Sequence, residues 1–462
     1  MHELSLQASR TGPILAATAA VLVAGLAAIA VPHPAVLVAI GLAPIAGILT
    51  FRMPFLLCLA FVVFSFFRIH EAFPVLNPLR IPQLLAMGTL AVISVRLATG
   101  RIVPFWSRQL GLFAIFFGLI TVGVLAATNR DISMAYWSQT FVKIAAMVLA
   151  IAWLTRGPAE FRLAYRSFIG AGMAVAMVAL ANSANGVGLV EGTRVTIGRD
   201  IGSVLGDPND LSLVLLFPLS FAAAVVLTRG TGIIDKLYGC VGAGTVMAAI
   251  VATQSRGGLL GIVAVFGTFA MRRIRSRLVL AVGGVIGLAV LSLAAGIGGR
   301  ASGGAGESGI DESSMGRLHA WQAAIRMALA RPFTGVGIDN YVQNYFYYSD
   351  WWEGFAKAVH STWFSVLAEG GFIAFAVFVT LIVSTMRSAL RSVRQLAPVE
   401  GHPHSPPAYA MAQAIVAGIV GFIVSGTFLT QGFTWPLYIL LALAVAVARN
   451  AAETTGRSAR RD

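Results

Sequence analysis

The amino-acid sequence predicts an all-α polytopic integral membrane protein with about 12–14 transmembrane helices and one large loop outside the membrane. Of its 462 residues, 57% are hydrophobic and only 11% are charged, whereas soluble domains have about 25% charged residues. The mean hydropathy is +0.82. Apolar stretches long enough to cross a bilayer follow one another along the chain, without the period-two alternation of barrel strands.

Each apolar window predicts one transmembrane helix. In lipid, only a helix with such a pattern provides hydrogen-bond partners for all of its own backbone N–H and C=O groups. The expected spans are 13–31, 34–51, 53–68, 80–98, 110–128, 140–155, 167–187, 209–228, 237–254, 257–271, 278–299, 361–386, 408–430 and 433–448. The lower limit of twelve helices is obtained if each of the two pairs of short spans, within 34–68 and 237–271, is counted as one helix.

A long polar interruption at residues 300–360 divides the chain. We expect four parts: residues 1–299 with eleven spans, the loop 300–360 with short amphipathic helices, residues 361–448 with three spans, and a basic tail at 449–462. No repeat with a period of 20–50 residues is visible, which excludes a solenoid.

The net charge of +14 is a signal of topology. Most lysines and arginines fall in alternate loops, as in the cluster at 272–277 and in the tail at 449–462. Cytoplasmic loops are enriched in these residues, so we expect both termini in the cytoplasm and the loop 300–360 on the external face. The basic charge then gives no reason to expect nucleic-acid binding.

Cys58 and Cys240 lie in apolar runs, without the spacing of a metal site or a disulfide framework.

The centre of the loop predicts an amphipathic helix that ends before Pro332. Its apolar residues recur at i, i+3, i+7 and i+11 on one face: Leu318, Trp321, Ile325 and Leu329. A helix lying in the membrane interface has this pattern. Arg317, in the first turn, would face the head groups at the base of a cavity. The alternatives are a solvated Arg317 and a Trp321 that only anchors the helix.

An aromatic tract follows a glycine turn. The turn Gly335-Val336-Gly337 could bring backbone N–H groups near an anion, although by itself it is a weak signal. The tract begins at Tyr341 and ends at Phe355. Such rings stack on sugars or pack at head groups, and the sequence leaves both open.

Ionisable residues at the rims of spans are candidates for function because burying them is costly. His360 lies where the loop re-enters the bilayer, and Glu369 and Lys143 lie inside spans. A lone histidine is as often structural, and Lys143 either points into the same cavity as the external Arg194, Arg199 and Arg256 or reaches to the surface.

Several arginines are expected on the same external face. Arg256 lies in the hairpin between two spans, while Arg194 and Arg199 precede the span that begins at Asn209. Guanidinium groups bind phosphate in a bidentate manner and stay charged, so this group suits a diphosphate.

Four motifs resemble the O-antigen ligase and polymerase superfamily. They are His360-Ser361 followed by nine residues and Gly371, Gly316 to Trp321, Pro332 to Gly337, and Ser255 to Gly258. The resemblance covers roughly residues 195–380. Ala374 stands where the ligase pattern has Gly, Thr or Tyr, which bears on the choice between ligase and polymerase.

The resemblance implies a GT-C-like glycosyltransferase of the bacterial inner membrane with its active site in the periplasm. Its donor would be a glycan on undecaprenyl diphosphate and its acceptor lipid A-core or another glycan, with membrane lipids around it and no metal or other cofactor. By position, Arg256 and Arg317 would hold the diphosphate, and His360 would act on the acceptor hydroxyl as general base or only orient it.

The residues themselves agree with that mechanism. No acidic pair for a metal stands out in the external loops, and arginines supply the stabilisation of charge that a metal would give. We expect five further residues to contact substrate: Arg194, Arg199, Asn209, Trp321 and Tyr341.

Within the same class, a polysaccharide polymerase and a protein O-oligosaccharyltransferase remain alternatives, separated by the acceptor. A transporter or flippase would place ionisable residues at mid-membrane and pair its broken helices, whereas here most charges lie in loops, with Lys143 and Glu369 as the exceptions. A scaffold without chemistry would not need arginines and a histidine on one face.

Overall fold

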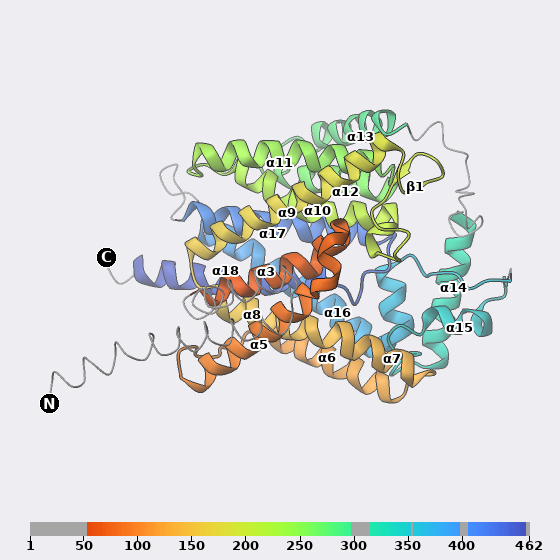
Figure 1. Cartoon of the computed structure of the whole chain (residues 1–462). Coiled ribbons are helices and arrows are strands. Elements are labelled where there is room, and N and C mark those ends of the chain that lie inside the picture. The colour runs from red at the N-terminus through yellow and green to blue at the C-terminus, as the bar shows by residue number, and fades with distance from the viewer. Residues whose placement is uncertain (1–52, 297–313, 353, 398–404, 459–462) are drawn as a thin grey trace, which may run out of the picture.

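The structure, a computed structural model, describes residues 53–296, 314–352, 354–397 and 405–458. It is a bundle of helices that run roughly side by side (Figure 1). The bundle helices are α3 (Pro54–Phe66), α5 (Ile81–Ala98), α6 (Arg108–Leu125), α7 (Arg130–Tyr136), α8 (Val142–Leu154), α9 (Pro158–Asn185), α10 (Pro208–Leu227), α11 (Ile233–Ala252), α12 (Arg256–Ala270), α13 (Arg277–Ala294), α16 (Thr362–Gln395), α17 (Pro406–Gly426) and α18 (Trp435–Ser458).

The expected all-α membrane fold is confirmed. Ten helices of the described part are long and apolar enough to cross a membrane, and two shorter apolar helices, α3 and α12, accompany them. Together they match the twelve predicted spans from 53–68 onward. The predicted spans 13–31 and 34–51 and the start of the loop, 300–313, lie outside the described residues.

Several helices are longer than the hydropathy windows. A continuous helical stretch runs from Arg130 to Leu154 through a π-turn, η2 (Trp137–Phe141), where the predicted span was 140–155. Helix α9 begins at Pro158, and α16 reaches Gln395. A hydropathy window detects only the apolar part of a helix, so polar turns at its ends were predicted as loops.

Burial is unequal across the bundle. Helices α10, α17 and α18 are the most buried, whereas α13 buries no residue and packs against α12. Close approach within the core depends on small residues: a Cβ on Gly172 of α9 would lie 2.4 Å from Cβ of Pro218 in α10. The central helices therefore form the scaffold from which the site is built.

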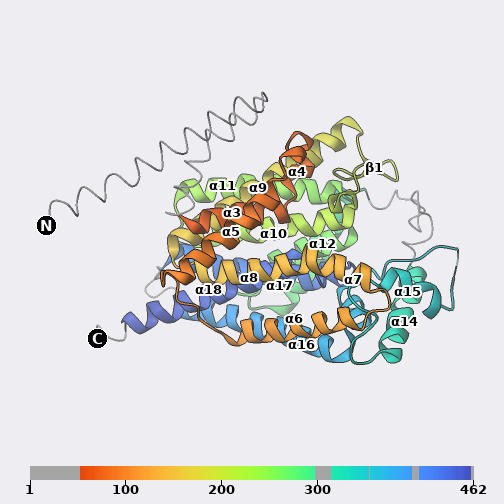
Figure 2. The same ribbon diagram turned by 60° about the horizontal axis from the view of Figure 1, so that its bottom comes forward.

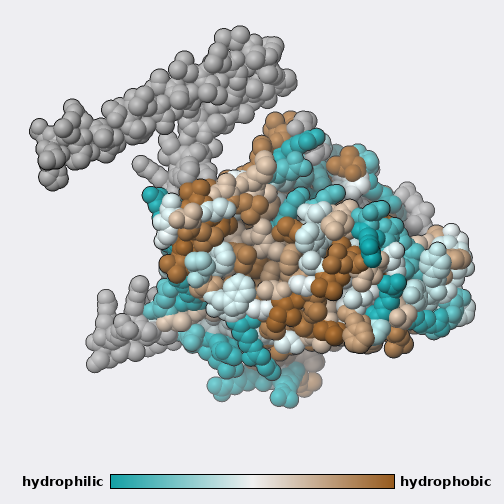
Figure 3. All heavy atoms as spheres, turned by 90° about the horizontal axis from the view of Figure 1, so that it is seen from below, coloured by the Kyte–Doolittle hydropathy of each residue, from teal (hydrophilic) through white to brown (hydrophobic). Residues whose placement is uncertain are grey.

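The polar segments gather at one end of the bundle, which we call the loop end. It carries the hairpin β1 (Leu189–Val190) and β2 (Arg194–Val195), α15 (Tyr341–Tyr348), and α14 (Ser314–Ala330), which lies across it. The C-terminal end of α18 lies at the opposite end (Figures 1 and 2). Apolar side chains cover much of the face between the two ends (Figure 3).

The helix predicted before Pro332 is present as α14, and the structure shows that it carries apolar residues on its buried face as well as on its exposed one. Ala320, Ala324 and Met327 are buried against the protein. Leu318 and Leu329, on the predicted apolar face, point away and are 51% and 65% exposed. An apolar face without protein contacts is what a helix in the membrane interface requires.

Candidate functional site

His360 lies at the start of a broken helix. Its backbone is left-handed, with φ 44°, and α16 begins two residues later. Gly371 interrupts α16 with φ 77° and ψ 179°. The segment 362–370 is therefore a short helix of its own, with the histidine of the motif at one end and its glycine at the other.

The turn that follows α14 fills the break. The amide of Phe372 donates to the carbonyl of Pro332 at 2.8 Å, and the amides of Val336 and Gly337 donate to the carbonyls of Ala368 and Glu369 at 2.9 and 3.2 Å. The amides of Val336 and Gly337 satisfy carbonyls that the interrupted helix leaves without their own partners, and the carbonyl of Pro332 accepts the first amide after the break.

The expected anion-binding role of the glycine turn is wrong. The amides of Gly335, Val336 and Gly337 all donate to backbone carbonyls. A Cβ on Gly335, which has φ 63°, would lie 2.4 Å from the carbonyl oxygen of Ala368. Glycine is required here for close packing against α16, not for binding phosphate.

Trp321 and Tyr341 hold α14 against the short helix. Nε1 of Trp321 donates to the carbonyl of Val359 at 3.1 Å, and its ring stacks on Phe364 at 5.1 Å between centroids. The Tyr341 hydroxyl donates to the carbonyl of Ala320 at 2.7 Å, and its side chain is only 2% exposed. In place of the expected substrate contact, Tyr341 packs in the core, and Trp321 positions the residues before His360.

The loop between α17 and α18 lies against the same short helix. The Thr362 hydroxyl donates to the carbonyl of Leu429 at 2.8 Å and accepts from the amide of Gln431 at 3.2 Å. Nε1 of Trp363 donates to the Thr427 hydroxyl at 3.0 Å. Sequence reasoning missed this loop because it is short, uncharged and joins two predicted spans.

Arg317 and Arg256 border that loop from two other elements. The Cζ atom of Arg317 lies 6.0 Å from the ring centroid of Phe428. Arg256 is exposed at the first turn of α12, whose N-cap Ser255 accepts the amide of Gly258 at 3.2 Å. A Cβ on Gly257 would lie 3.9 Å from the ring of Phe428. Arg317 thus adjoins residues 425–431 directly, and His360 and Arg256 are close in the chain to residues that do, Thr362 and Gly257.

Arg194 and Asn209 come together, but they bind each other. Nη2 of Arg194 donates to Oδ1 of Asn209 at 2.8 Å, and its Nε donates to the carbonyl of Thr253 at 3.2 Å. Arg194 is 1% exposed. In this structure Arg194 fastens β2 to α10 and to the turn before α12, and no surface of it faces a substrate.

The start of α10 also reaches the α17–α18 loop. Arg199 is exposed at the loop end, with Nη1 3.4 Å from the carbonyl of Gly206. Nε2 of Gln431 donates to Oδ1 of Asp210 at 2.7 Å. Of the five expected substrate contacts, Arg199 is the one whose side chain is exposed.

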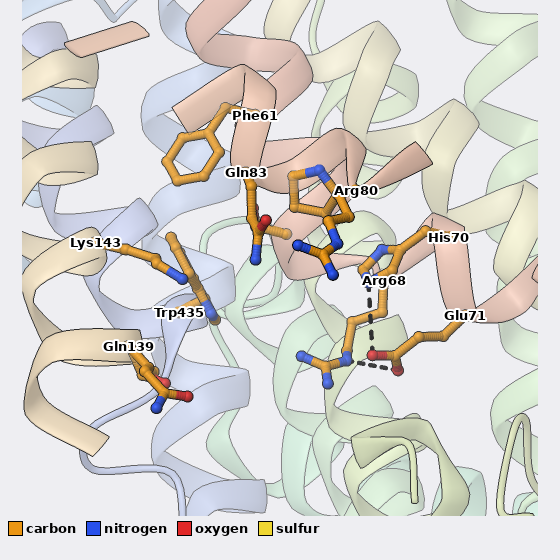
Figure 4. A pocket seen from close by; sticks show the side chains of 12 residues that line it. Phe61, Arg68, His70, Glu71, Arg80, Gln83, Gln139, Lys143 and Trp435 are labelled. Carbon is orange, nitrogen blue, oxygen red and sulfur yellow. Dashed lines mark hydrogen bonds and ion pairs between the residues drawn. The ribbon is translucent and has the colours of Figure 1, made fainter. Parts of the chain in front are cut away.

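A second set of cations lines a cavity of about 340 Å³ that sequence reasoning did not single out. Arg68, Arg80 and Lys143 line it together (Figure 4). The sequence placed the first two only at the ends of an external loop. A contact between residues so distant in the chain has no signal in composition or spacing.

Within the described ranges, no group of three or more His, Cys, Asp or Glu side chains is placed to hold a metal ion. Whether transfer needs a metal stays a prediction about the reaction.

Comparison with known proteins agrees with the motifs. No curated protein matches the chain. Residues 241–379 match the family model described as O-antigen ligase. The matched stretch contains Arg256, Arg317, His360 and the break at Gly371, and it places this part of the chain in the O-antigen ligase and polymerase superfamily.

Proposed function

We propose that this protein is an O-antigen ligase that transfers a polysaccharide from undecaprenyl diphosphate to lipid A-core on the periplasmic face of the bacterial inner membrane. One observation carries the proposal. Three elements far apart in the chain meet at the segment 425–431 of the loop end: Arg317 lies beside Phe428, while Thr362, two residues after His360, and Gly257, next to Arg256, lie against the same segment.

The two arginines suit the leaving group. In transfer, the acceptor hydroxyl oxygen attacks C1 of the donor sugar, and the bond from C1 to the diphosphate oxygen breaks with inversion at C1. The lipid diphosphate leaves with an added negative charge. Arg256 and Arg317 stabilise that charge, because guanidinium groups stay charged and bind phosphate oxygens in pairs.

His360 suits the acceptor. A neutral imidazole is available near pH 7 and takes the proton of the attacking hydroxyl as the new bond forms. The left-handed backbone at His360 costs about 1–3 kcal/mol and persists where surrounding contacts enforce it. Here the bond from Trp321 to the carbonyl of Val359 and the bonds of Thr362 supply those contacts on either side.

Orientation completes the proposal. The C-terminal end of α18 lies away from the loop end, and the basic residues of the tail favour the cytoplasm for it. The loop end would then face the periplasm, where a lipid-linked glycan is available. Labelling of single cysteines at the two ends of the bundle in intact cells tests this orientation.

Replacing Arg317 with Ala tests the site. We expect loss of transfer in an assay with purified protein, lipid-linked glycan and lipid A-core, with an unchanged unfolding midpoint. Arg326→Ala on the same helix is the matched control, since Arg326 pairs with exposed Asp350 outside the site. Wild-type activity in the Arg317 variant would remove this residue from the mechanism.

The choice of acceptor decides among related activities. The same assay is run with lipid A-core, with a second lipid-linked glycan, and with a pilin-like protein. Transfer to lipid A-core supports the ligase. Transfer only to the second lipid-linked glycan identifies a polymerase, and Ala374, which departs from the ligase pattern, is the residue that bears on this choice.

A further inference from the structure

A cavity at the loop end holds cations that the proposed catalytic group does not use. Helices α3, α5, η2, α8 and α18 contribute to its wall, together with the short helix α4 (Ile69–Ala72) and residues beside it (Figure 4). Its polar lining residues are Ser65, Arg68, His70, Glu71, Arg80, Gln83, Gln139, Thr140 and Lys143. We call it the cationic cavity.

The charges in the cationic cavity are not balanced. Arg68, Arg80 and Lys143 face one carboxylate, Glu71. That carboxylate is already used: Nε of Arg68 lies 2.7 Å from its Oε2, and the Ser203 hydroxyl also donates to it. In the described part of the chain, no hydrogen bond or ion pair reaches the side chain of Arg80 or Lys143.

Two cations left uncompensated in one cavity repel each other, and Lys143 is half-buried in a membrane-spanning helix. Charges in such positions are costly and mark sites of function. An anion in the cavity removes the repulsion and gives both side chains a partner. The cavity is therefore suited to a ligand with negative charge.

Two of the three cations have an unusual backbone conformation. Arg68 and Arg80 precede α4 and α5 with left-handed backbones, φ 50° and 46°. Non-glycine residues adopt this conformation rarely, and such strain gathers at ligand sites. Two arginines at the two ends of the short segment 68–80, both strained and both lining one cavity, indicate a built site.

The other lining residues narrow the class of ligand. Burial lowers the pKa of His70, an effect that Glu71 partly offsets, so this imidazole is neutral at pH 7 and adds no charge. Gln83 and Gln139 offer amides for hydroxyl or phosphate oxygens. The volume of about 340 Å³ accommodates a diphosphate together with part of a sugar.

The cavity borders the candidate site. Trp435 lines it and directly follows the α17–α18 loop, whose other side contacts Thr362. The Tyr136 hydroxyl, in the helix before Gln139, donates to the carbonyl of Phe433 in that loop at 3.4 Å. The α17–α18 loop therefore connects the wall of the cavity with the short helix after His360.

We propose that the cationic cavity binds a phosphate or diphosphate group of one of the two lipid-linked substrates, through Arg68, Arg80 and Lys143. The assignment to a substrate rests on the proposed function, whereas the binding of the anion does not. The group comes either from the donor diphosphate or from a phosphate on the acceptor.

Titration of the purified full-length protein with pyrophosphate, followed by calorimetry, tests binding without turnover. The background is Arg256→Ala/Arg317→Ala, which removes the catalytic cations. We expect pyrophosphate binding in this background and a loss of about tenfold or more on adding Arg80→Gln and Lys143→Gln. Arg130→Gln, an exposed arginine outside the cavity, is the matched control. Equal affinity in all three proteins overturns the proposal.

A charge-preserving variant separates binding from folding. Arg80→Lys keeps the cation and should bind pyrophosphate within a few-fold of the background, with an unchanged unfolding midpoint. If Arg80→Lys loses binding as fully as Arg80→Gln while both stay folded, charge is not what binds the anion, and the proposal fails.

Two-substrate kinetics with otherwise wild-type protein identifies the source of the phosphate. The variant Arg80→Gln/Lys143→Gln should raise the KM for one substrate by about tenfold or more and change kcat little. A higher KM for the donor assigns the donor diphosphate, and a higher KM for the acceptor assigns its phosphate. If neither KM rises, the cavity binds no substrate group and that assignment is refuted. If no glycan is transferred at all, the proposed function fails. The titration then still shows whether the cavity binds pyrophosphate.

Discussion

Replacing Gly371 with Ala should separate α14 from the short helix that begins after His360. The φ of 77° and ψ of 179° at Gly371 belong to a region that is essentially restricted to glycine. A Cβ at this position would also lie 2.6 Å from the carbonyl oxygen of Pro332 and 2.9 Å from the carbonyl carbon of Phe333. Both neighbouring atoms belong to the backbone, so no side chain can turn away to make room.

Two costs add up in this variant. Backbone strain in such a region costs about 1–3 kcal/mol, and overpacking of a filled site costs about 1–3 kcal/mol. The sum, about 2–6 kcal/mol, is a large part of the roughly 5–15 kcal/mol that stabilises a typical domain. Relief requires the turn 331–337 to move, which breaks the hydrogen bond from Phe372 to Pro332.

The assay compares Gly371→Ala with Gly118→Ala, both purified in detergent. Gly118 lies within α6, where a Cβ would meet nothing within 4 Å, so this variant controls for the substitution itself. We expect a lower thermal unfolding midpoint and reduced transfer only for Gly371→Ala. If both variants unfold at the wild-type midpoint and transfer at the wild-type rate, the break does not depend on glycine and our explanation of the motif is wrong.

Three further outcomes are expected. Transfer should persist in EDTA, and a strict requirement for a divalent metal would contradict charge stabilisation by arginines. Trp321→Phe keeps the stacking but loses the bond to the carbonyl of Val359, so kcat should fall about two- to tenfold with KM nearly unchanged; an unchanged kcat argues against a positioning role. The hydrogen bond from Arg326 lowers the pKa of Asp350, so the contribution of this pair to stability is present above the usual pKa of aspartate and is lost as pH falls through the lowered one. Because the pair is exposed, Asp350→Asn should change the unfolding midpoint only slightly at pH 7 and not at all at acidic pH, as thermal denaturation at both values will show.

The apolar windows of the sequence predict the membrane helices well because a bilayer imposes a length and a composition on each span. Every predicted span from 53–68 onward has its helix in the described residues. The first and last residues of these helices are predicted poorly. Polar first turns such as the one after Pro158 lie outside the hydrocarbon and leave no trace in hydropathy. The break at Gly371 was not predicted, although the pair Gly370-Gly371 inside the span 361–386 is a dipeptide that often marks a turn.

The site was predictable where charge stands out against an apolar background. His360, Arg317 and Arg256 are conspicuous for that reason, and each lies in or beside an element that packs against the segment 425–431. The same reasoning cannot predict which of the charged side chains are exposed to solvent. Arg194 is as conspicuous in the sequence as Arg199, yet it is buried on backbone and side-chain partners. Contacts between elements decide that difference, and no local pattern encodes them.

Glu369 bears on the alternative of a transporter, for which a carboxylate inside a span would serve as a proton carrier. Its side chain is 6% exposed, and its two oxygens accept the amide of Tyr341 at 3.1 Å and the Ser365 hydroxyl at 3.4 Å. The amide belongs to the first turn of α15, whose amides have no partner within the helix. Glu369 therefore fastens α15 to the short helix after His360, and the break that exposes the carbonyls of this helix is filled by a turn of the same chain. Lys143, the other exception named from the sequence, lines a cavity together with two arginines. Both exceptions thus have a place in a site at one membrane face, as a glycosyltransferase requires, and neither forms a relay through the bundle.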